Sequence, residues 1–158
     1  MKRFSILLFL VIIAAFTSWA YHVFKPEWVS FRKAERFYEK KEYVMAIPLY
    51  QSTLQRGLEK PIILSRLAES LYITGKLTDA LPLYIKAARE NPLNTKAALT
   101  LGDIYLRIGK PDEAIGVYSE ILDRKPENRT VRIKLARALT QANRFDEAVN
   151  EYRKALGG

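Results

Sequence analysis

Residues 95–128, TKAALTLGDIYLRIGKPDEAIGVYSEILDRKPEN, decide the fold, because their pattern recurs along the chain at a step of 34 residues. Four alanines keep this step, and so do four tyrosines and four small residues. The three series are Ala46, Ala80, Ala114 and Ala148; Tyr50, Tyr84, Tyr118 and Tyr152; and Ala34, Ala68, Gly102 and Ala136. A fixed period of this length predicts one structural unit repeated four times.

Each unit is predicted to hold two helices with a turn between them. In the quoted stretch, the first helix is expected to run from Thr95 to Ile108, and Gly109 then supplies a left-handed C-cap. Pro111 suits the first position of the second helix, and Pro126 ends that helix. We expect the small residues of the series to lie where two helices approach closely. A larger side chain there would overpack the contact, at a cost of about 1–3 kcal/mol.

Several positions in common register resemble the tetratricopeptide repeat, and the resemblance covers residues 27–156. The quoted unit carries the pattern best, at Leu101, Gly102, Tyr105, Gly109, Ala114, Tyr118 and Pro126. The first unit is the weakest, since Lys33 stands where the other units have leucine. The resemblance implies an all-α fold in which four helix-turn-helix repeats form an α-solenoid. The predicted repeats are 27–60, 61–94, 95–128 and a truncated 129–158. It also implies that the first helices line a concave groove for a peptide segment or a partner helix.

The segment that precedes the repeats, residues 1–25, is strongly apolar. Between residues 4 and 24 the sequence holds 21 uncharged residues in a row. As a helix this run would be about 31 Å long, close to the hydrocarbon thickness of a bilayer. We predict a single transmembrane anchor, with Trp19 and Tyr21 near one interface. A cleaved signal peptide stays open as the alternative, because the tripeptide at 18–20 is compatible with a cleavage site.

The flanking charges bear on the orientation of this anchor. Lys2 and Arg3 favour an N-terminus on the inside, whereas the stretch that follows the anchor is also basic. Large domains are translocated largely regardless of their charge. We therefore expect the repeats on the periplasmic side of a bacterial cytoplasmic membrane. A cytoplasmic position of the repeats stays the alternative.

The composition excludes several classes of function. The sequence contains no cysteine, which excludes disulfides, thiol catalysis and zinc–thiolate sites. The one histidine, His22, falls in the predicted anchor, and no Gly-rich phosphate loop occurs. We therefore expect no enzyme activity, no catalytic residue, no metal and no cofactor. The net charge of +9 favours acidic partners or an anionic membrane surface. Nucleic acid is disfavoured as a partner, because no recognition motif accompanies the charge.

Helical spacing places candidate groove residues on one face of each first helix. The candidates are Trp28, Phe31, Glu35, Tyr38, Glu69, Tyr72, Asp103 and Arg137. Three of them, Glu35, Glu69 and Asp103, repeat in register, and Arg137 breaks their series. We expect a polarised groove that is acidic and aromatic toward the anchor and basic at its far end. The alternative for the acids is a solvated helix face.

The last unit exposes a second candidate surface. Val149, Tyr152 and Leu156 have no following repeat to pack on in this sequence, so we expect a partner protein or a second copy there. The alternative is that this end tolerates some apolar exposure. The sequence as a whole predicts a non-catalytic, membrane-anchored scaffold that serves as an assembly factor or adaptor for a membrane-associated complex. The second hypothesis is a permanent structural subunit of a large membrane complex with an unoccupied groove.

Overall fold

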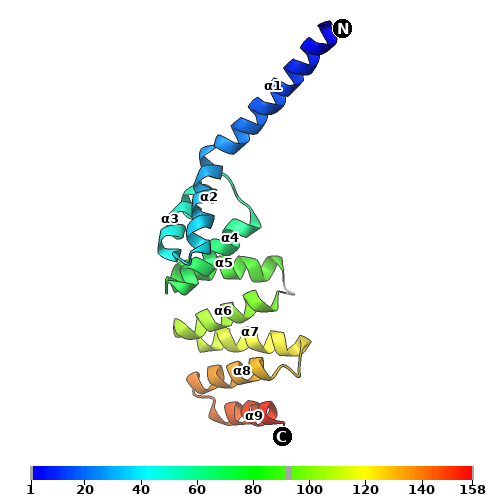
Figure 1. Ribbon diagram of the computed structural model, residues 1–158. Coiled ribbons are helices and arrows are strands. Elements are labelled where there is room, and N and C mark those ends of the chain that lie inside the picture. The colour runs from blue at the N-terminus through cyan, green and yellow to red at the C-terminus, as the bar shows by residue number, and fades with distance from the viewer. Residues whose placement is uncertain (1, 92–93, 158) are drawn as a thin grey trace. The chain divides into compact units, whose positions relative to one another are not determined.

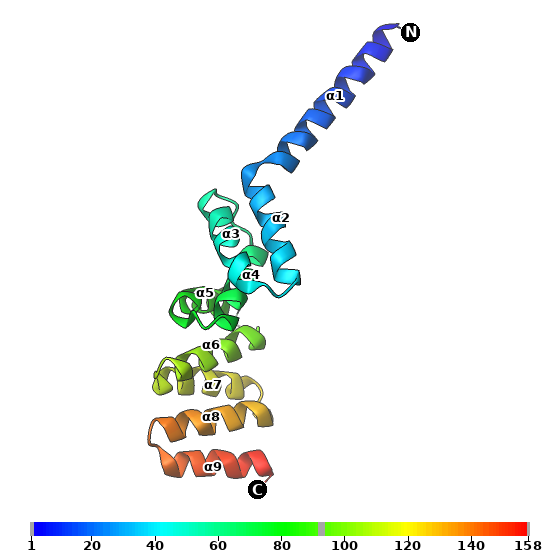
Figure 2. The same cartoon turned by 60° about the vertical axis from the view of Figure 1, so that its left-hand side comes forward.

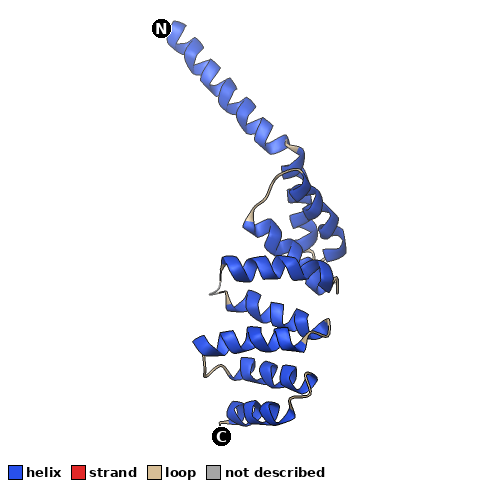
Figure 3. Cartoon of the chain, turned by 180° about the vertical axis from the view of Figure 1, so that it is seen from behind, coloured by secondary structure: helices blue, strands red, loops and turns tan. Residues whose placement is uncertain are grey.

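The computed structural model describes residues 2–91 and 94–157, without the side chains of residues 2–5, 7, 8 and 22–24. The side chains of Lys2, Arg3 and His22, on which part of the sequence interpretation rests, therefore lie outside the described residues. Every element in the described part is a helix, which confirms the predicted all-α fold (Figure 3).

Nine helices occur in the described residues (Figure 1). They are α1 (Lys2–Phe24), α2 (Pro26–Glu39), α3 (Tyr43–Gln55), α4 (Pro61–Ile73), α5 (Leu77–Glu90), α6 (Thr95–Arg107), α7 (Pro111–Arg124), α8 (Arg129–Gln141) and α9 (Phe145–Leu156). The chain divides into two compact units, Met1–Ser70 and Leu71–Gly158. Two successive helices fall within each stretch that the 34-residue period delimits, and the repeat boundaries themselves stay a prediction.

In the first unit, α2 pairs with α3, and α1 contacts α2. The pair closes over Ala34, Ala46 and Tyr50, all of which are completely buried. Ala34 belongs to the small-residue series, Ala46 to the alanine series and Tyr50 to the tyrosine series. The close helix contact that the sequence predicted for the small residues is therefore present in this unit.

In the second unit, the successive helices α6 to α9 stack as layers, each against the next (Figures 1 and 2). One apolar cluster runs through α6 to α9 and includes Ala114, Tyr118, Leu135 and Ala148. Gly102 of α6 faces the Tyr118 ring so closely that an added Cβ would lie 2.5 Å from the ring atom Cε1. Glycine at this position therefore has a steric reason, because even a methyl group would displace the ring.

The turn within each helix pair uses the same backbone conformation in all four repeats. Lys41, Gly75, Gly109 and Asn143 stand 34 residues apart, and each follows a first helix with a positive φ, of 61°, 78°, 76° and 61°. Glycine adopts this left-handed conformation without a steric cost, whereas a residue with a Cβ does so at a cost. The sequence analysis identified only Gly109 as such a cap and missed the equivalent positions, of which Gly75 and Asn143 are residue types that favour a positive φ.

The first helices of the last two repeats share an N-cap. The side chains of Asn94 and Asn128, again 34 residues apart, accept hydrogen bonds of 3.2 Å from the backbone N–H groups of Ala97 and Val131. Each satisfies a backbone donor that has no partner within its helix. The two caps set where α6 and α8 begin, and so set the register of the side chains along these two helices.

Helix α1 presents apolar side chains around its surface. Among those described, Phe9, Val11, Phe16, Trp19 and Tyr21 are all exposed. No single helix in the described residues has both the length and the hydropathy of a membrane span. Residues 9–21 and α2 meet these criteria only together, as a pair bent by 57°.

Candidate protein-binding face

The acids of the in-register series accept hydrogen bonds from tyrosines inside the protein. Oδ1 of Asp103 accepts one from the hydroxyl of Tyr118 at 2.7 Å. Glu35 accepts one in the same way from Tyr50, which also lies fifteen residues later on the second helix of the pair. Burial and this hydrogen bond raise the pKa of both tyrosines, so that each hydroxyl remains a donor.

This pairing has a clear energetic reason. Tyr50 and Tyr118 are completely buried, and a buried hydroxyl without a partner costs about 1–3 kcal/mol. The carboxylate of the neighbouring first helix removes that cost. The signal was present in the sequence, since the acids and the tyrosines form two series with a constant offset of fifteen residues. Each series was interpreted alone, and the pairing was missed.

In the first unit, the predicted groove residues Glu35, Tyr38 and Glu69 belong to one polar cluster. The hydroxyl of Tyr38 donates to Glu69, and the guanidinium of Arg66 lies 4.2 Å from the centroid of the Tyr38 ring. Nε of Arg66 also lies 3.9 Å from Oε2 of Glu35. Arg66 therefore balances part of the acidic charge that the sequence analysis assigned to a groove.

The two remaining candidates of the first unit, Trp28 and Phe31, lie against one another. Their rings make an edge-to-face contact with centroids 6.0 Å apart, and the Phe31 ring lies 6.5 Å from that of Tyr50. Nζ of Lys60 lies over the indole of Trp28, 4.5 Å from its centroid. Both aromatic side chains are only partly accessible, since Phe31 packs on Tyr50 of α3 and Trp28 is covered by Phe31 and Lys60.

In the second unit, Asp103 is paired a second time. Nζ of Lys134 donates to both carboxylate oxygens, at 2.6 Å and 2.8 Å. Sequence reasoning did not select Lys134, although it stands one helical turn before Arg137 on the same side of α8. With a tyrosine and a lysine on its carboxylate, Asp103 presents little uncompensated negative charge to a ligand.

The candidate Tyr72 is part of a small stack. Its ring makes an edge-to-face contact with that of Tyr84, with centroids 6.2 Å apart. The guanidinium of Arg107 lies 5.4 Å from the Tyr72 centroid. Arg107 is exposed, so the stack holds a cation at the surface of α6.

Arg137 is exposed on α8 and stands where the three preceding repeats carry an acid. The carboxylate that pairs with the buried tyrosine in the first and third repeats is therefore replaced in the fourth. Tyr152 at the corresponding position is 37% exposed, whereas Tyr50 and Tyr118 are fully buried. The structure thus pairs the acid with the tyrosine of the series in the first and third repeats, joins Glu69 to Tyr38 instead, and leaves Arg137 at the surface.

The C-terminal candidates lie along one side of α9. Val149 is 55% exposed and Leu156 is 77% exposed. Phe145, which the sequence analysis did not select, is also exposed and extends the same stripe by one turn. The corresponding positions of α7, Tyr118 and Leu122, are buried in the core against α8.

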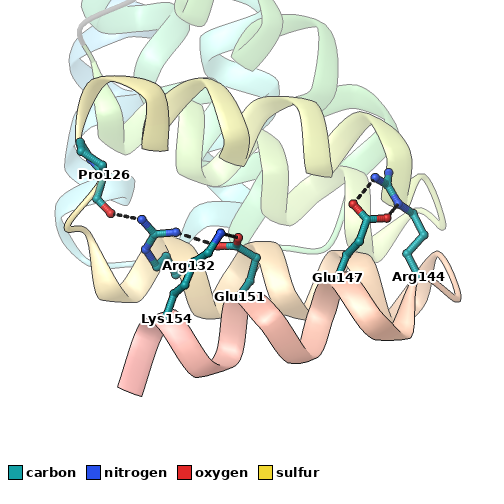
Figure 4. Close-up of polar contacts among 6 residues, drawn as sticks. All are labelled: Pro126, Arg132, Arg144, Glu147, Glu151 and Lys154. Carbon is teal, nitrogen blue, oxygen red and sulfur yellow. Dashed lines mark hydrogen bonds and ion pairs between the residues drawn. The ribbon is translucent and has the colours of Figure 1, made fainter. Parts of the chain in front are cut away.

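A group of charged side chains holds α9 onto the unit (Figure 4). Nη1 of Arg132 on α8 donates to Oε2 of Glu151 at 2.8 Å, and Nη2 donates to the carbonyl of Pro126 at 2.5 Å. Nζ of Lys154 donates to Oε1 of the same carboxylate at 2.7 Å. Burial alone would raise the pKa of Glu151, but the hydrogen bonds from Lys154 and Arg132 lower it.

Within the part of the chain that the structure describes, no three or more His, Asp or Glu side chains are grouped so that they could hold a metal ion. The buried polar contacts described above join side chains to one another. They satisfy donors and acceptors, which is a structural function.

Comparison with known proteins extends this description. A family profile described as Tetratricopeptide repeat matches residues 31–95, 65–129 and 99–158. Among solved structures, MamA of AMB-1 is 24% identical with a TM-score of 0.74, and the match covers 83% of this chain and 72% of that one. MamA of MSR-1 is 21% identical with a TM-score of 0.74, over 84% and 76% of the two chains.

A third solved structure, residues 41 to the end of MamA from Desulfovibrio magneticus RS-1, is 16% identical with a TM-score of 0.70, over 84% of this chain and 75% of that one. At these identities the three structures show a common fold and nothing more. A search of curated proteins found no match to this chain.

Proposed function

Because the chain belongs to the tetratricopeptide repeat family, we propose that it is a non-catalytic scaffold for protein interactions, anchored in a membrane by α1. It would hold a partner close to the bilayer as an assembly factor or adaptor of a membrane-associated complex. Because the anchor and the partner-binding repeats lie on one chain, they raise the effective concentration of the bound partner near the membrane. Repeats of this family serve protein binding, and that observation carries the proposal.

The apolar surface of α1 supports the anchor. Soluble proteins rarely leave large apolar side chains uncovered around a whole helix, because each contributes about 1.5–3 kcal/mol when it is removed from water. Exposed Phe9, Leu10, Phe16 and Trp19 in one helix therefore favour a lipid environment. We propose that the repeats lie on the periplasmic side of a bacterial cytoplasmic membrane.

The anchor has a direct test. The full chain, expressed in bacteria, should stay in the membrane pellet after extraction with alkaline carbonate, and its intact mass should include residues 1–25. A mature protein that begins after residue 20 would favour the signal peptide instead. An alkaline phosphatase fused after residue 157 should be active if the repeats are periplasmic and inactive if they are cytoplasmic.

The alternative, a permanent structural subunit, is favoured by the exposed stripe of α9. This stripe corresponds to the side of α7 that α8 covers, so its chemistry suits a further helix. Such a helix could come from a partner or from a second copy of this chain. The candidate residues are Val149, Tyr152 and Leu156, with Phe145 beside them.

Cross-linking in intact membranes, followed by mass spectrometry, separates the two proposals. Trp28→Ala removes an aromatic side chain from the candidate groove, and Leu156→Asp places a charge in the stripe of α9. Loss of the cross-linked partner with the Trp28 variant supports the scaffold. Loss only with the Leu156 variant would support the structural subunit and reject the groove.

A further inference from the structure

The neighbouring sides of α6 and α8 form one cationic surface, which we call the α6–α8 face. Its residues are Lys96, Thr100, Asp103 and Arg107 on α6, and Thr130, Lys134, Arg137 and Gln141 on α8. Each set follows steps of four, three and four, and so lies along one side of its helix. The Lys134–Asp103 ion pair joins the two sets, and Nε2 of Gln141 donates to the carbonyl of Leu106 at 3.3 Å. The two stripes are therefore direct neighbours.

The free charge of this face is positive. Asp103 is the one acid among its eight residues, and both carboxylate oxygens accept hydrogen bonds from Lys134. The cations that remain are Lys96, Arg107 and Arg137, all of them exposed. The sequence analysis expected the acidic series to face a ligand. On this face the charge of the Asp103 carboxylate is instead neutralised by Lys134, and the remaining cations face the solvent.

From these charges we infer that the α6–α8 face binds an acidic, extended segment of a partner protein. This inference rests on the proposed scaffold function and names the chemistry of its partner. Lys96 and Arg107 stand eleven residues apart, which is about 16 Å along α6. An extended segment of about five residues spans that length. Its carboxylates would meet Lys96 and Arg107 near its two ends, and Arg137 from the side of α8.

Two observations favour a peptide over a lipid surface or a nucleic acid. Leu99, Leu106 and Ile133 lie half-buried beside the cations, so the face offers apolar contacts that suit side chains between the acids. Acids also stand in the first turns of α7 and α9, so acidic and basic side chains alternate over the surface of this unit and form no continuous basic sheet. A phosphate backbone or a bilayer requires a broader basic surface.

Arg107 is partly ordered before any ligand arrives. Its guanidinium lies over the Tyr72 ring at 5.4 Å from the centroid, which restricts its rotamers. A side chain held in this way loses less entropy on binding than a free one.

The test uses the full chain in micelles of a detergent with an uncharged headgroup. The probe is a fluorescein-labelled octapeptide of alternating glutamate and alanine. The uncharged control is the labelled octapeptide of alternating glutamine and alanine. Fluorescence anisotropy should show that the chain binds the glutamate peptide at least about tenfold more tightly, and that added salt weakens this binding.

Charge-reversal variants locate the site. Lys96→Glu and Arg137→Glu should each weaken the glutamate peptide about tenfold, a ratio of dissociation constants that matches the reversal of one exposed ion pair. Arg153→Glu makes the same change of net charge on α9, away from this face, and should leave binding within about twofold. Arg137→Glu should fold normally, since three other repeats carry an acid at that position; thermal melting checks this.

Three results would overturn the inference. One is equal binding of the glutamate and glutamine peptides. Another is an equal loss of affinity with Arg153→Glu and Arg137→Glu, which would mean a diffuse charge effect. The third is displacement of the peptide at lower concentration by dihexanoyl phosphatidylglycerol or oligothymidylate than by the unlabelled peptide. Each would leave the scaffold proposal standing, because membrane cross-linking tests that proposal without reference to charge.

Discussion

The hydroxyl of Tyr118 on α7 donates a 2.7 Å hydrogen bond to Oδ1 of Asp103 on α6. The same carboxylate accepts from Lys134 on α8. One acid therefore joins three successive helices of the second unit. Because the tyrosine is fully buried, the interaction satisfies a donor that has no access to water.

This relationship predicts a thermodynamic coupling. Asp103→Ala should lower the free energy of unfolding by about 1–3 kcal/mol, because it leaves the Tyr118 hydroxyl without an acceptor. Tyr118→Phe should cost less in the Asp103→Ala background than in the wild type, since the orphaned donor is then removed. Urea unfolding of the two single variants and the double variant measures the coupling. Additive effects of the two changes would contradict the role assigned to this pair.

The close approach at Gly102 makes a second prediction. Gly102→Ala should lower the free energy of unfolding by about 1–3 kcal/mol, because the new methyl group would lie 2.5 Å from the Tyr118 ring. Gly116 is the matched control. It lies in the interior of α7 with no heavy atom within 4 Å of an added Cβ. Gly116→Ala should therefore stabilise the protein by about 0.5–1 kcal/mol through helix propensity alone.

Thermal unfolding of these two variants separates steric from backbone effects. If both substitutions moved the midpoint in the same direction, the packing of Tyr118 on Gly102 would not explain the glycine.

The turn between α2 and α3 carries a removable strain. Lys41 adopts a φ of 61°, at a position where the next two repeats have glycine. Lys41→Gly should raise the free energy of unfolding by about 1 kcal/mol, because the left-handed conformation costs a lysine about that much. Asn143→Gly should raise it less, since asparagine tolerates this conformation better. Chemical denaturation of both variants checks the order, and a destabilised Lys41→Gly protein would contradict it.

The ion pairs of Glu151 with Arg132 and Lys154, which we call the clasp on α9, predict a dependence of stability on pH. The folded pKa of Glu151 lies below its value in the unfolded chain, because Lys154 and Arg132 stabilise the carboxylate. Its contribution is therefore present at pH values above the unfolded pKa and is lost as the pH falls through the folded pKa. Glu151→Gln should destabilise the protein by about 1–2 kcal/mol at pH 7 and much less at pH 2–3.

The comparison variant for the clasp is Glu147→Gln. Glu147 is exposed, and its pKa is lowered by the hydrogen bonds from Arg144. Since an exposed ion pair is screened by water and salt, this variant should show a smaller loss of stability than Glu151→Gln at pH 7. Unfolding curves of both variants at the two pH values test the assignment, and equal losses would argue against the clasp.

Much of the fold could be predicted because its determinants are local and periodic. The 34-residue recurrence of small residues indicated paired helices in close contact, and the buried Ala34, Ala114 and Gly102 confirm that prediction. The glycine turn at Gly109 was also predicted. The equivalent turns at Gly75 and Asn143 were overlooked, although glycine and asparagine both favour a positive φ. The turn at Lys41 gives no such signal, because lysine rarely adopts this conformation.

The candidate site was predicted less well. Helical spacing placed Glu35 and Asp103 on one side of their helices, but spacing does not say what a side chain bonds. Each carboxylate turned out to face a tyrosine fifteen residues away, and Lys134 reached Asp103 from the next repeat. The sign of the charge left at the surface therefore depended on pairings between helices.

The periodicity of the sequence by itself determined that the chain forms the helix pairs of a repeat protein. Small residues that recur at a fixed step let two helices approach closely at the same place in every unit. Tertiary structure alone decided which charges remain free. Lys134 on α8 neutralises the charge of Asp103 on α6, whereas Arg137, one turn further along α8, is exposed to solvent. Electrostatic pairing depends on distances of a few ångströms between side chains that are far apart in the chain, and only packing sets those distances.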